Sequence, residues 1–179
     1  MREKKVRILA EIGMAVALAV VFNFLPLWKM PQGGSVSLEM LPILIIAFRW
    51  GGVPGMAAGL VYGLVQLAIN PYIVHPVQLI LDYPLPYMLV GIAGFIPLKA
   101  QVDSARYAVL FFAVLLGGAA RFVSHLLSGV IFFSQYAPEG QSPWLYSAIY
   151  NGSYMIPSLI ISFLIILPLL KKLILNNKK

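Results

Sequence analysis

The sequence contains no cysteine and only two histidines among its 179 residues, and charged residues make up only 11% of it. The absence of cysteine excludes disulfide bonds, thiolate catalysis and cysteine-ligated metal sites. Two histidines are too few for a typical metal site. The chain also has no GxxxxGK[ST] loop, so it cannot hydrolyse ATP by a Walker-type site. We therefore predict that the chain is not an enzyme and has neither a bound metal nor a cofactor.

Hydrophobic residues, in contrast, make up 60% of the chain, which is too high for an ordinary soluble domain. They form continuous runs rather than an alternating pattern, which favours membrane-spanning helices over a closed β-barrel. The first run follows the basic segment MREKKVR and has no convincing cleavage site, so we interpret it as a retained helix and not a signal peptide. The net charge of +7 does not indicate nucleic-acid binding, because most basic residues lie between the apolar runs.

We predict an all-α, polytopic membrane protein in which residues 1–179 form a single integral membrane domain in contact with lipid. Prolines, glycine pairs and polar segments separate six apolar runs, each of which we expect to be a transmembrane helix. The six predicted helices span approximately residues 8–27, 36–48, 54–69, 77–96, 107–133 and 144–170.

The distribution of basic residues predicts the orientation, because short cytoplasmic loops carry an excess of lysine and arginine. In a six-helix arrangement the basic residues outside the predicted helices fall on one side, and Lys29 is the exception. The residues on the basic side are Arg2, Lys4, Lys5, Arg7, Arg49, Lys99, Arg106, Lys171, Lys172, Lys178 and Lys179. We therefore expect both termini to be cytoplasmic.

Asp82 is the first candidate for a binding residue, because it lies within the fourth predicted helix, in the run VQLILDYPLPYML. A charge in the hydrocarbon region costs at least about 2.5 kcal/mol, so it requires a partner, a cavity or a function. Pro84 and Pro86 each remove a helix hydrogen bond, which membrane helices tolerate best beside a cavity or a packed neighbour. We favour a ligand-facing role for Asp82 over neutralisation by Arg121.

Arg121 and His125 lie four residues apart and therefore share one face of the fifth predicted helix. Arg121 is closer to the cytoplasm, and we interpret it as structural, neutralised by Asp82 or Asp103 or bound to carbonyl groups. His125 lies at the depth that we assign to Asp82. A lone buried histidine is usually a hydrogen-bonded core residue, but the shared depth with an acid favours a binding site.

Two further acids lie near the ends of predicted helices. Glu11 is four residues from Arg7 on the same helix face, and we expect an ion pair at the membrane interface. Glu39 opens the second helix close to the outer surface, where water is within reach. A carboxylate favoured by the helix dipole and a ligand contact are equally good explanations of Glu39, so we keep it among the candidate substrate-binding residues.

The sixth predicted helix begins with WLYSAIYNGSYM, which places Tyr146, Tyr150 and Tyr154 on one broad face. Tyrosines near a helix end commonly form an interfacial belt, but Asn151 needs hydrogen-bond partners inside the membrane. A carboxylate, an imidazole, an amide and several aromatic rings together suit a flat organic cation, which ion pairing and cation–π attraction would bind.

Three stretches of the chain resemble the thiamin-specific S-components of energy-coupling factor (ECF) vitamin transporters: PYIVHPVQLILDYPL, RFVSHLLSGVIFFSQYAPEG and SPWLYSAIYNGSYM. The resemblance extends over essentially the whole chain. It implies a six-helix subunit of the cell membrane that captures thiamin in an outward-facing pocket. It also implies partners: a transmembrane coupling subunit and two cytoplasmic ATPase subunits. The alternatives are an S-component for another vitamin or heteroaromatic precursor and, less favoured, a small membrane enzyme.

The resemblance also assigns substrate-binding positions. Asp82 matches the family's binding acid, which is glutamate in some members, and Phe133 stands where some members have a stacking tryptophan. A shorter acid and a smaller ring affect the expected affinity more than the identity of the ligand. The remaining positions implied by the resemblance are Tyr72, Tyr83, His125, Tyr146 and Asn151.

Two features of the first predicted helix and the loop after it complete the prediction. Ala15 and Ala19 have the four-residue spacing of small residues that lets helices approach closely. Spacing alone favours packing within the bundle, whereas the family resemblance implies contact with the coupling subunit. We interpret Asn23, near the outer end of this helix, as structural. The following loop, PLWKMPQGGSVS, is a plain connector or, as we hypothesise, a lid over the bound ligand.

Overall fold

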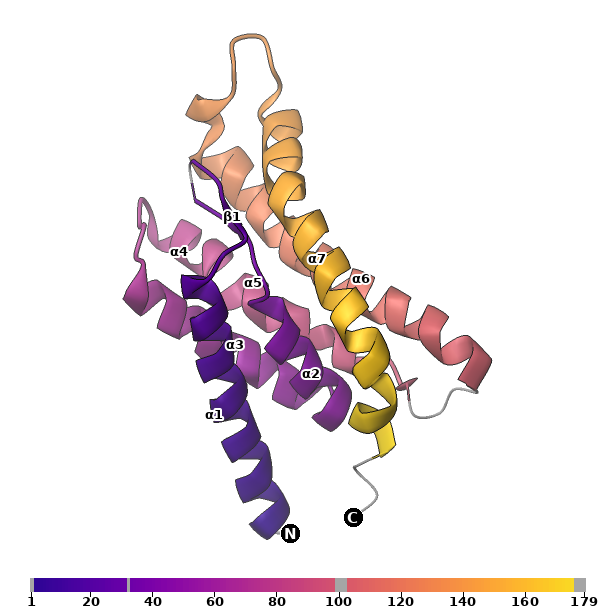
Figure 1. Cartoon of the computed structure of the whole chain (residues 1–179). Helices are drawn as coiled ribbons and strands as arrows, with labels where there is room; N and C mark the ends of the chain where they lie inside the picture. The colour runs from indigo at the N-terminus through magenta and orange to yellow at the C-terminus, as the bar shows by residue number, and fades with distance from the viewer. Residues whose placement is uncertain (1, 32, 99–102, 176–179) are drawn as a thin grey trace.

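The computed structural model describes residues 2–31, 33–98 and 103–175, which form a helical bundle with one short hairpin (Figure 1). The larger helices are α1 (Arg2–Phe24), α2 (Met40–Trp50), α3 (Gly52–Ile69), α6 (Asp103–Phe132) and α7 (Pro143–Leu175). The shorter elements are β1 (Trp28–Lys29), β2 (Ser35–Val36), α4 (Pro76–Asp82), α5 (Pro84–Val90), the 3₁₀ helices η1 (Gly91–Phe95) and η3 (Ser134–Tyr136).

The predicted membrane-spanning architecture is confirmed. In the described part of the chain, five helical stretches are long and apolar enough to cross a membrane, and the shorter apolar helix α2 is the sixth. Every predicted helix has a counterpart, and the boundaries differ by a few residues. The largest differences are at α1, which begins at Arg2 because its charged first turns are also helical, and at α7, which continues to Leu175.

The predicted helix over 77–96 is three shorter segments, α4, α5 and η1. The break between α4 and α5 falls at Tyr83, whose backbone leaves the helical region (φ −116°, ψ −81°). Pro84 follows in the first turn of α5, where its missing N–H group costs no helix hydrogen bond. Beside the break, the hydroxyl of Ser124 on α6 donates to the carbonyl of Leu81 at 2.7 Å. The break therefore places the end of α4, with Asp82, against α6.

The connection between α1 and α2 contains an antiparallel hairpin, whereas the sequence predicted that the second helix begins at Val36. Trp28 pairs with Val36 in this hairpin, and Lys29 pairs with Ser35. The turn between the strands contains Gly34 with φ of +81°, a conformation that glycine adopts without steric cost.

Glycines on α3 allow α5 to approach it backbone to backbone. A Cβ atom at Gly59 would lie 1.9 Å from the carbonyl oxygen of Tyr87, and one at Gly63 would lie 2.4 Å from that of Tyr83. No larger side chain fits at such distances, so these glycines fix the position of α5, which carries Tyr87, and of Tyr83 directly before it.

The core fills the space between the helices, and the inner face of α1 contributes to it. Ala19 is fully buried in the main apolar cluster, and Ala15 packs with Ile46 of α2 and Ala58 of α3. Both side chains thus pack within the bundle, as their spacing alone favours, and the contact with a coupling subunit that the resemblance implies stays a prediction.

Basic residues of α1 and α2 lie together at one end of the bundle. Glu11 forms the predicted ion pair with Arg7 at 3.1 Å and a second ion pair with Arg49 at 2.7 Å, and it also accepts a hydrogen bond from Trp50. The start of α1 and the end of α2 therefore lie together, and the end of α7 lies at the same end of the molecule (Figure 1). Lys99, Lys178 and Lys179 lie outside the described residues.

Candidate functional site

A pocket of about 840 Å³ lies at the opposite end, between the hairpin, α4, α6 and α7. This volume lies within the range of small-molecule sites. The structure brings all eight predicted substrate-binding residues to the lining of this pocket: Glu39, Tyr72, Asp82, Tyr83, His125, Phe133, Tyr146 and Asn151. The helix break contributes to this lining, because it turns the end of α4, with Asp82, toward α6.

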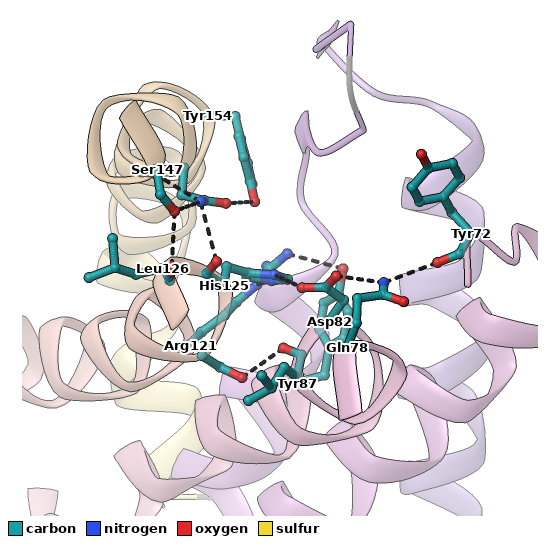
Figure 2. Close-up of polar contacts among 12 residues, drawn as sticks. Tyr72, Gln78, Asp82, Tyr87, Arg121, His125, Leu126, Ser147 and Tyr154 are labelled. Atoms are coloured by element: carbon teal, nitrogen blue, oxygen red, sulfur yellow. Dashed lines mark hydrogen bonds and ion pairs between the residues drawn. The ribbon is translucent and has the colours of Figure 1, made fainter. Parts of the chain in front are cut away.

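Asp82 and His125 form the polar centre of the pocket (Figure 2). Oδ1 of Asp82 lies 3.3 Å from Nδ1 of His125, and their side chains are 19% and 11% exposed. Nε2 of the same imidazole lies 3.4 Å from Nε of Arg121, which can only donate. The arrangement fits a neutral imidazole that accepts from Arg121 and donates through Nδ1 to the carboxylate, so the negative charge of Asp82 faces the pocket.

Tyr83, directly after Asp82, contacts the loop between α3 and α4. Its hydroxyl accepts a hydrogen bond from the backbone N–H of Tyr72 at 2.8 Å and donates to the carbonyl of Asn70 at 2.9 Å. Since its side chain is 8% exposed, Tyr83 contributes to the pocket mainly by fixing this loop.

The amide of Asn151 has the partners that its depth requires. Nδ2 donates to the carbonyl of Ser147 at 2.9 Å and, at a longer 3.4 Å, to the carbonyl of His125, while Oδ1 accepts from the hydroxyl of Tyr154 at 2.7 Å. These bonds connect the amide on α7 to the backbone of α6. Asn151 thus joins the two helices at the edge of the pocket.

Aromatic rings form one wall of the pocket, which we call the aromatic wall. Tyr72 and Phe133 stack with ring centroids 6.0 Å apart, and Phe133 also stacks with Tyr136 at 6.3 Å. Tyr146 and Tyr150 on α7 lie 5.9 Å apart. These rings offer several faces to a flat ligand, and their partly exposed positions leave those faces accessible from the pocket.

Glu39 is more deeply buried than predicted, with 2% of its surface exposed, and its side chain makes no capping bond at α2. Its carboxylate accepts a hydrogen bond from Ser37 at 2.8 Å and another from Tyr87. The residues before α2 and the α5 tyrosine therefore enclose most of Glu39, although it also lines the pocket.

Arg121 is connected to Glu39 through Tyr87. Its guanidinium donates to the Tyr87 hydroxyl at 3.0 Å and lies 4.3 Å from the centre of the same ring. This relay replaces direct neutralisation by Asp82, which was one of the three alternatives for Arg121, and the side chain of Asp103 lies outside the described part of the structure. Arg121 is 6% exposed and contributes a buried positive charge to the pocket.

The hairpin covers one side of the pocket and touches α7. The Tyr150 hydroxyl donates to the carbonyl of Gly33 at 2.8 Å. A Cβ atom at Gly34 would lie 2.7 Å from the Tyr154 ring, so the turn lies directly on that ring. These contacts place the loop that the sequence marked as a possible lid at the wall of the pocket.

Sequence reasoning missed several lining residues. Asn23 was interpreted as structural, yet it lines the pocket and donates to Glu39 at 3.3 Å. Tyr87 belongs to an apolar run in the sequence. Only its contacts with Glu39 and Arg121 in the structure distinguish it from an ordinary core residue. Other lining residues that were not assigned to the site are Lys29, Gln66, Asn70, Ser147 and Tyr154.

The fold and the site together define a class: a multi-pass helical membrane protein with a charged and aromatic pocket open at one end of its bundle. A family model described as thiamine transporter protein (Thia_YuaJ) matches residues 9–177, and the chain belongs to this family.

Individual relatives agree with this membership. The chain is 41% identical over 167 residues to the thiamine transporter ThiT of Bacillus subtilis (strain 168). This match covers 88% of this chain and 87% of the relative. It is 28% identical over 177 residues to ThiT of Lacticaseibacillus paracasei, with coverage of 92% and 87%. A solved structure of ThiT from Listeria monocytogenes matches with a TM-score of 0.84 at 32% identity, covering 96% of this chain and 98% of that one.

Proposed function

We propose that this protein is the thiamin-capture subunit, or S-component, of an ECF-type transporter of the cell membrane. It would bind thiamin from the outside and pass it inward without changing it chemically. The observation that carries the proposal is the Asp82 carboxylate beside His125 in the pocket of a helical membrane protein, in a chain whose relatives are named thiamine transporters.

The chemistry of the pocket supports thiamin as the ligand. Thiamin joins a flat aminopyrimidine to a positively charged thiazolium ring. A carboxylate attracts the cation, and aromatic faces such as Tyr72 and Phe133 add stacking and cation–π contacts of about 0.5–2 kcal/mol each. The amide of Asn151 and the phenol of Tyr146 supply donors and acceptors for the pyrimidine. We propose that all eight predicted residues contact or position the ligand.

The distribution of charge supports an outward-facing pocket. Basic residues at the end of the bundle opposite the pocket favour a cytoplasmic location for that end, so the pocket would face outward. The chain contains no Walker-type loop, so we propose that a transmembrane coupling subunit and two cytoplasmic ATPases supply the energy. The hairpin between α1 and α2 would act as a lid, held on α7 by its contacts with Tyr150 and Tyr154.

Calorimetry of the purified protein against thiamin, its pyrimidine precursor, riboflavin and biotin tests the proposal. We expect one thiamin site per chain, weaker binding of the uncharged pyrimidine and no binding of riboflavin or biotin. Binding should also change the emission of Trp28, which lies in the hairpin. Preference for riboflavin or biotin would overturn the proposed ligand while leaving the membrane fold unaffected.

A further inference from the structure

Gln78 is a buried amide that connects the binding acid to the outer loop of the pocket. It lies on α4, one turn before Asp82, and only 1% of its surface is exposed. Its Nε2 donates to Oδ2 of Asp82 at 2.7 Å and to the carbonyl of Tyr72 at 3.0 Å. Its Oε1 accepts from the backbone N–H of Val74 at 3.1 Å. Figure 2 shows Gln78 between Tyr72 and Asp82.

These contacts fix the orientation of the Gln78 amide. Rotating it by 180° would place its oxygen against the carboxylate of Asp82 and the carbonyl of Tyr72, and its NH₂ group against the N–H of Val74. Two of the contacts would then place an acceptor against an acceptor, and the third would place a donor against a donor. Such contacts leave buried polar groups without hydrogen bonds, which is costly. A single arrangement of Gln78 is therefore compatible with its surroundings.

The same contacts fix the position of Asp82. Gln78 binds one carboxylate oxygen and His125 lies beside the other, at 2.7 Å and 3.3 Å. Aspartate has one methylene fewer than glutamate, so its carboxylate reaches less far from the helix. Two neutral partners hold it in one orientation without cancelling its charge, which leaves that charge available to a cationic ligand.

The loop before α4 is held by the same residue. The Tyr83 hydroxyl binds the N–H of Tyr72, and Gln78 binds the carbonyl of Tyr72, so the backbone of this residue is fixed on both sides. The side chain of Tyr72 stacks on Phe133 at the aromatic wall of the pocket. Gln78 thus connects the aromatic wall to the acidic centre.

We propose that Gln78 is a positioning residue that determines specificity for a cationic ligand by orienting the Asp82 carboxylate relative to the aromatic wall. This inference rests on the proposed function, because it assumes that Asp82 faces the thiazolium ring. Gln78 acts through Asp82 and Tyr72 and need not touch the ligand itself.

The test compares Gln78→Met with the wild type in binding thiamin and the uncharged pyrimidine fragment. Methionine keeps the length of the side chain and removes its hydrogen bonds. We expect thiamin affinity to fall by about 10- to 100-fold, the range for a hydrogen bond to a charged group, while affinity for the pyrimidine changes less than about threefold. Gln135→Met, the same change at an exposed outer position, serves as the matched control.

Two further variants separate positioning from general damage. Gln78→Glu keeps the shape but places a second carboxylate beside Asp82, and we expect it to lose more thiamin affinity than Gln78→Met. In Asp82→Asn, adding Gln78→Met should cost little further affinity, because both changes act on the same interaction.

The outcomes distinguish the two proposals. If the wild type does not bind thiamin, the proposed function fails. If the wild type binds thiamin and Gln78→Met or Gln78→Glu binds it equally well, only the role of Gln78 is overturned. Equal losses for thiamin and for the pyrimidine fragment would also overturn that role, since they would indicate a general disturbance of the pocket.

Discussion

The carboxylate of Asp82 lies 3.3 Å from the imidazole of His125, although one residue ends α4 and the other lies on α6. This contact exists because the helix breaks at Tyr83 and the end of α4 turns toward α6. A neutral histidine orients the acid without neutralising it, and the negative charge of Asp82 remains in the lining of the pocket.

Phe133→Trp should strengthen thiamin binding by a few-fold. Tryptophan offers a larger and more electron-rich face to a cation than phenylalanine, and Phe133 already stacks on Tyr72 at the pocket. Titration with thiamin, followed by calorimetry and by quenching of the new tryptophan, measures the change. Phe132→Trp is the control, since Phe132 stacks on His75 and is not a lining residue of the pocket. Weaker binding by Phe133→Trp would contradict a stacking role.

Gly34→Ala should displace the hairpin from α7 and speed the release of thiamin. The added Cβ would lie 2.7 Å from the Tyr154 ring, and φ of +81° is also unfavourable for alanine. Gly33→Ala has a similar strain, with φ of +92°, but meets no atom within 4 Å. Stopped-flow dissociation rates of the two variants therefore isolate the effect of the clash.

A lid that covers the ligand should also move when thiamin binds. Spin labels placed on the hairpin and on α7 would report this movement as a change in distance. Distances that stay the same with and without thiamin would count against the lid.

Tyr87→Phe should destabilise the protein by about 1–3 kcal/mol. The hydroxyl accepts from Arg121 and donates to Glu39, so its removal leaves both buried charges short of a partner. The ring and its contact with the guanidinium remain. Thermal unfolding in detergent measures the loss, and Tyr107→Phe, at an exposed position, should leave the midpoint unchanged. An unchanged midpoint for Tyr87→Phe would mean that the relay does not stabilise the fold.

Gly59→Ala should disrupt the contact between α3 and α5, because its Cβ would overlap the backbone at Tyr87. We expect a loss of about 1–3 kcal/mol in stability, the usual cost of overpacking, and weaker thiamin binding because α5 and Tyr87 shift. Gly13→Ala, on α1 with no atom within 4 Å, should be neutral or slightly stabilising. Similar unfolding midpoints for the two variants would refute the close-packing explanation.

The membrane-spanning architecture could be predicted from the sequence because long apolar runs have one stable solution in a bilayer. Asp82 and His125 could also be selected, since ionisable groups at membrane depth are costly and therefore few. Their contact could be expected only from shared depth, and the family resemblance added positions such as Tyr72 that hydropathy does not distinguish.

Other features depend on three-dimensional neighbours and were outside the reach of sequence patterns. Tyr87 lies in an apolar run, so its link between Glu39 and Arg121 has no local signal. The spacing of Ala15 and Ala19 shows that they share a helix face, but it does not show which neighbour that face meets. The hairpin after α1 has strands of only two residues each, too short for a periodic pattern.

The most direct test of the account is a calorimetric titration of thiamin against the wild type and Asp82→Asn, side by side. Asparagine keeps the shape of the side chain and removes its charge. The account predicts one site per wild-type chain and a loss of affinity of at least about 30-fold in the variant, since breaking a buried charge pair costs about 2 kcal/mol or more. Equal affinities of the two proteins would contradict it.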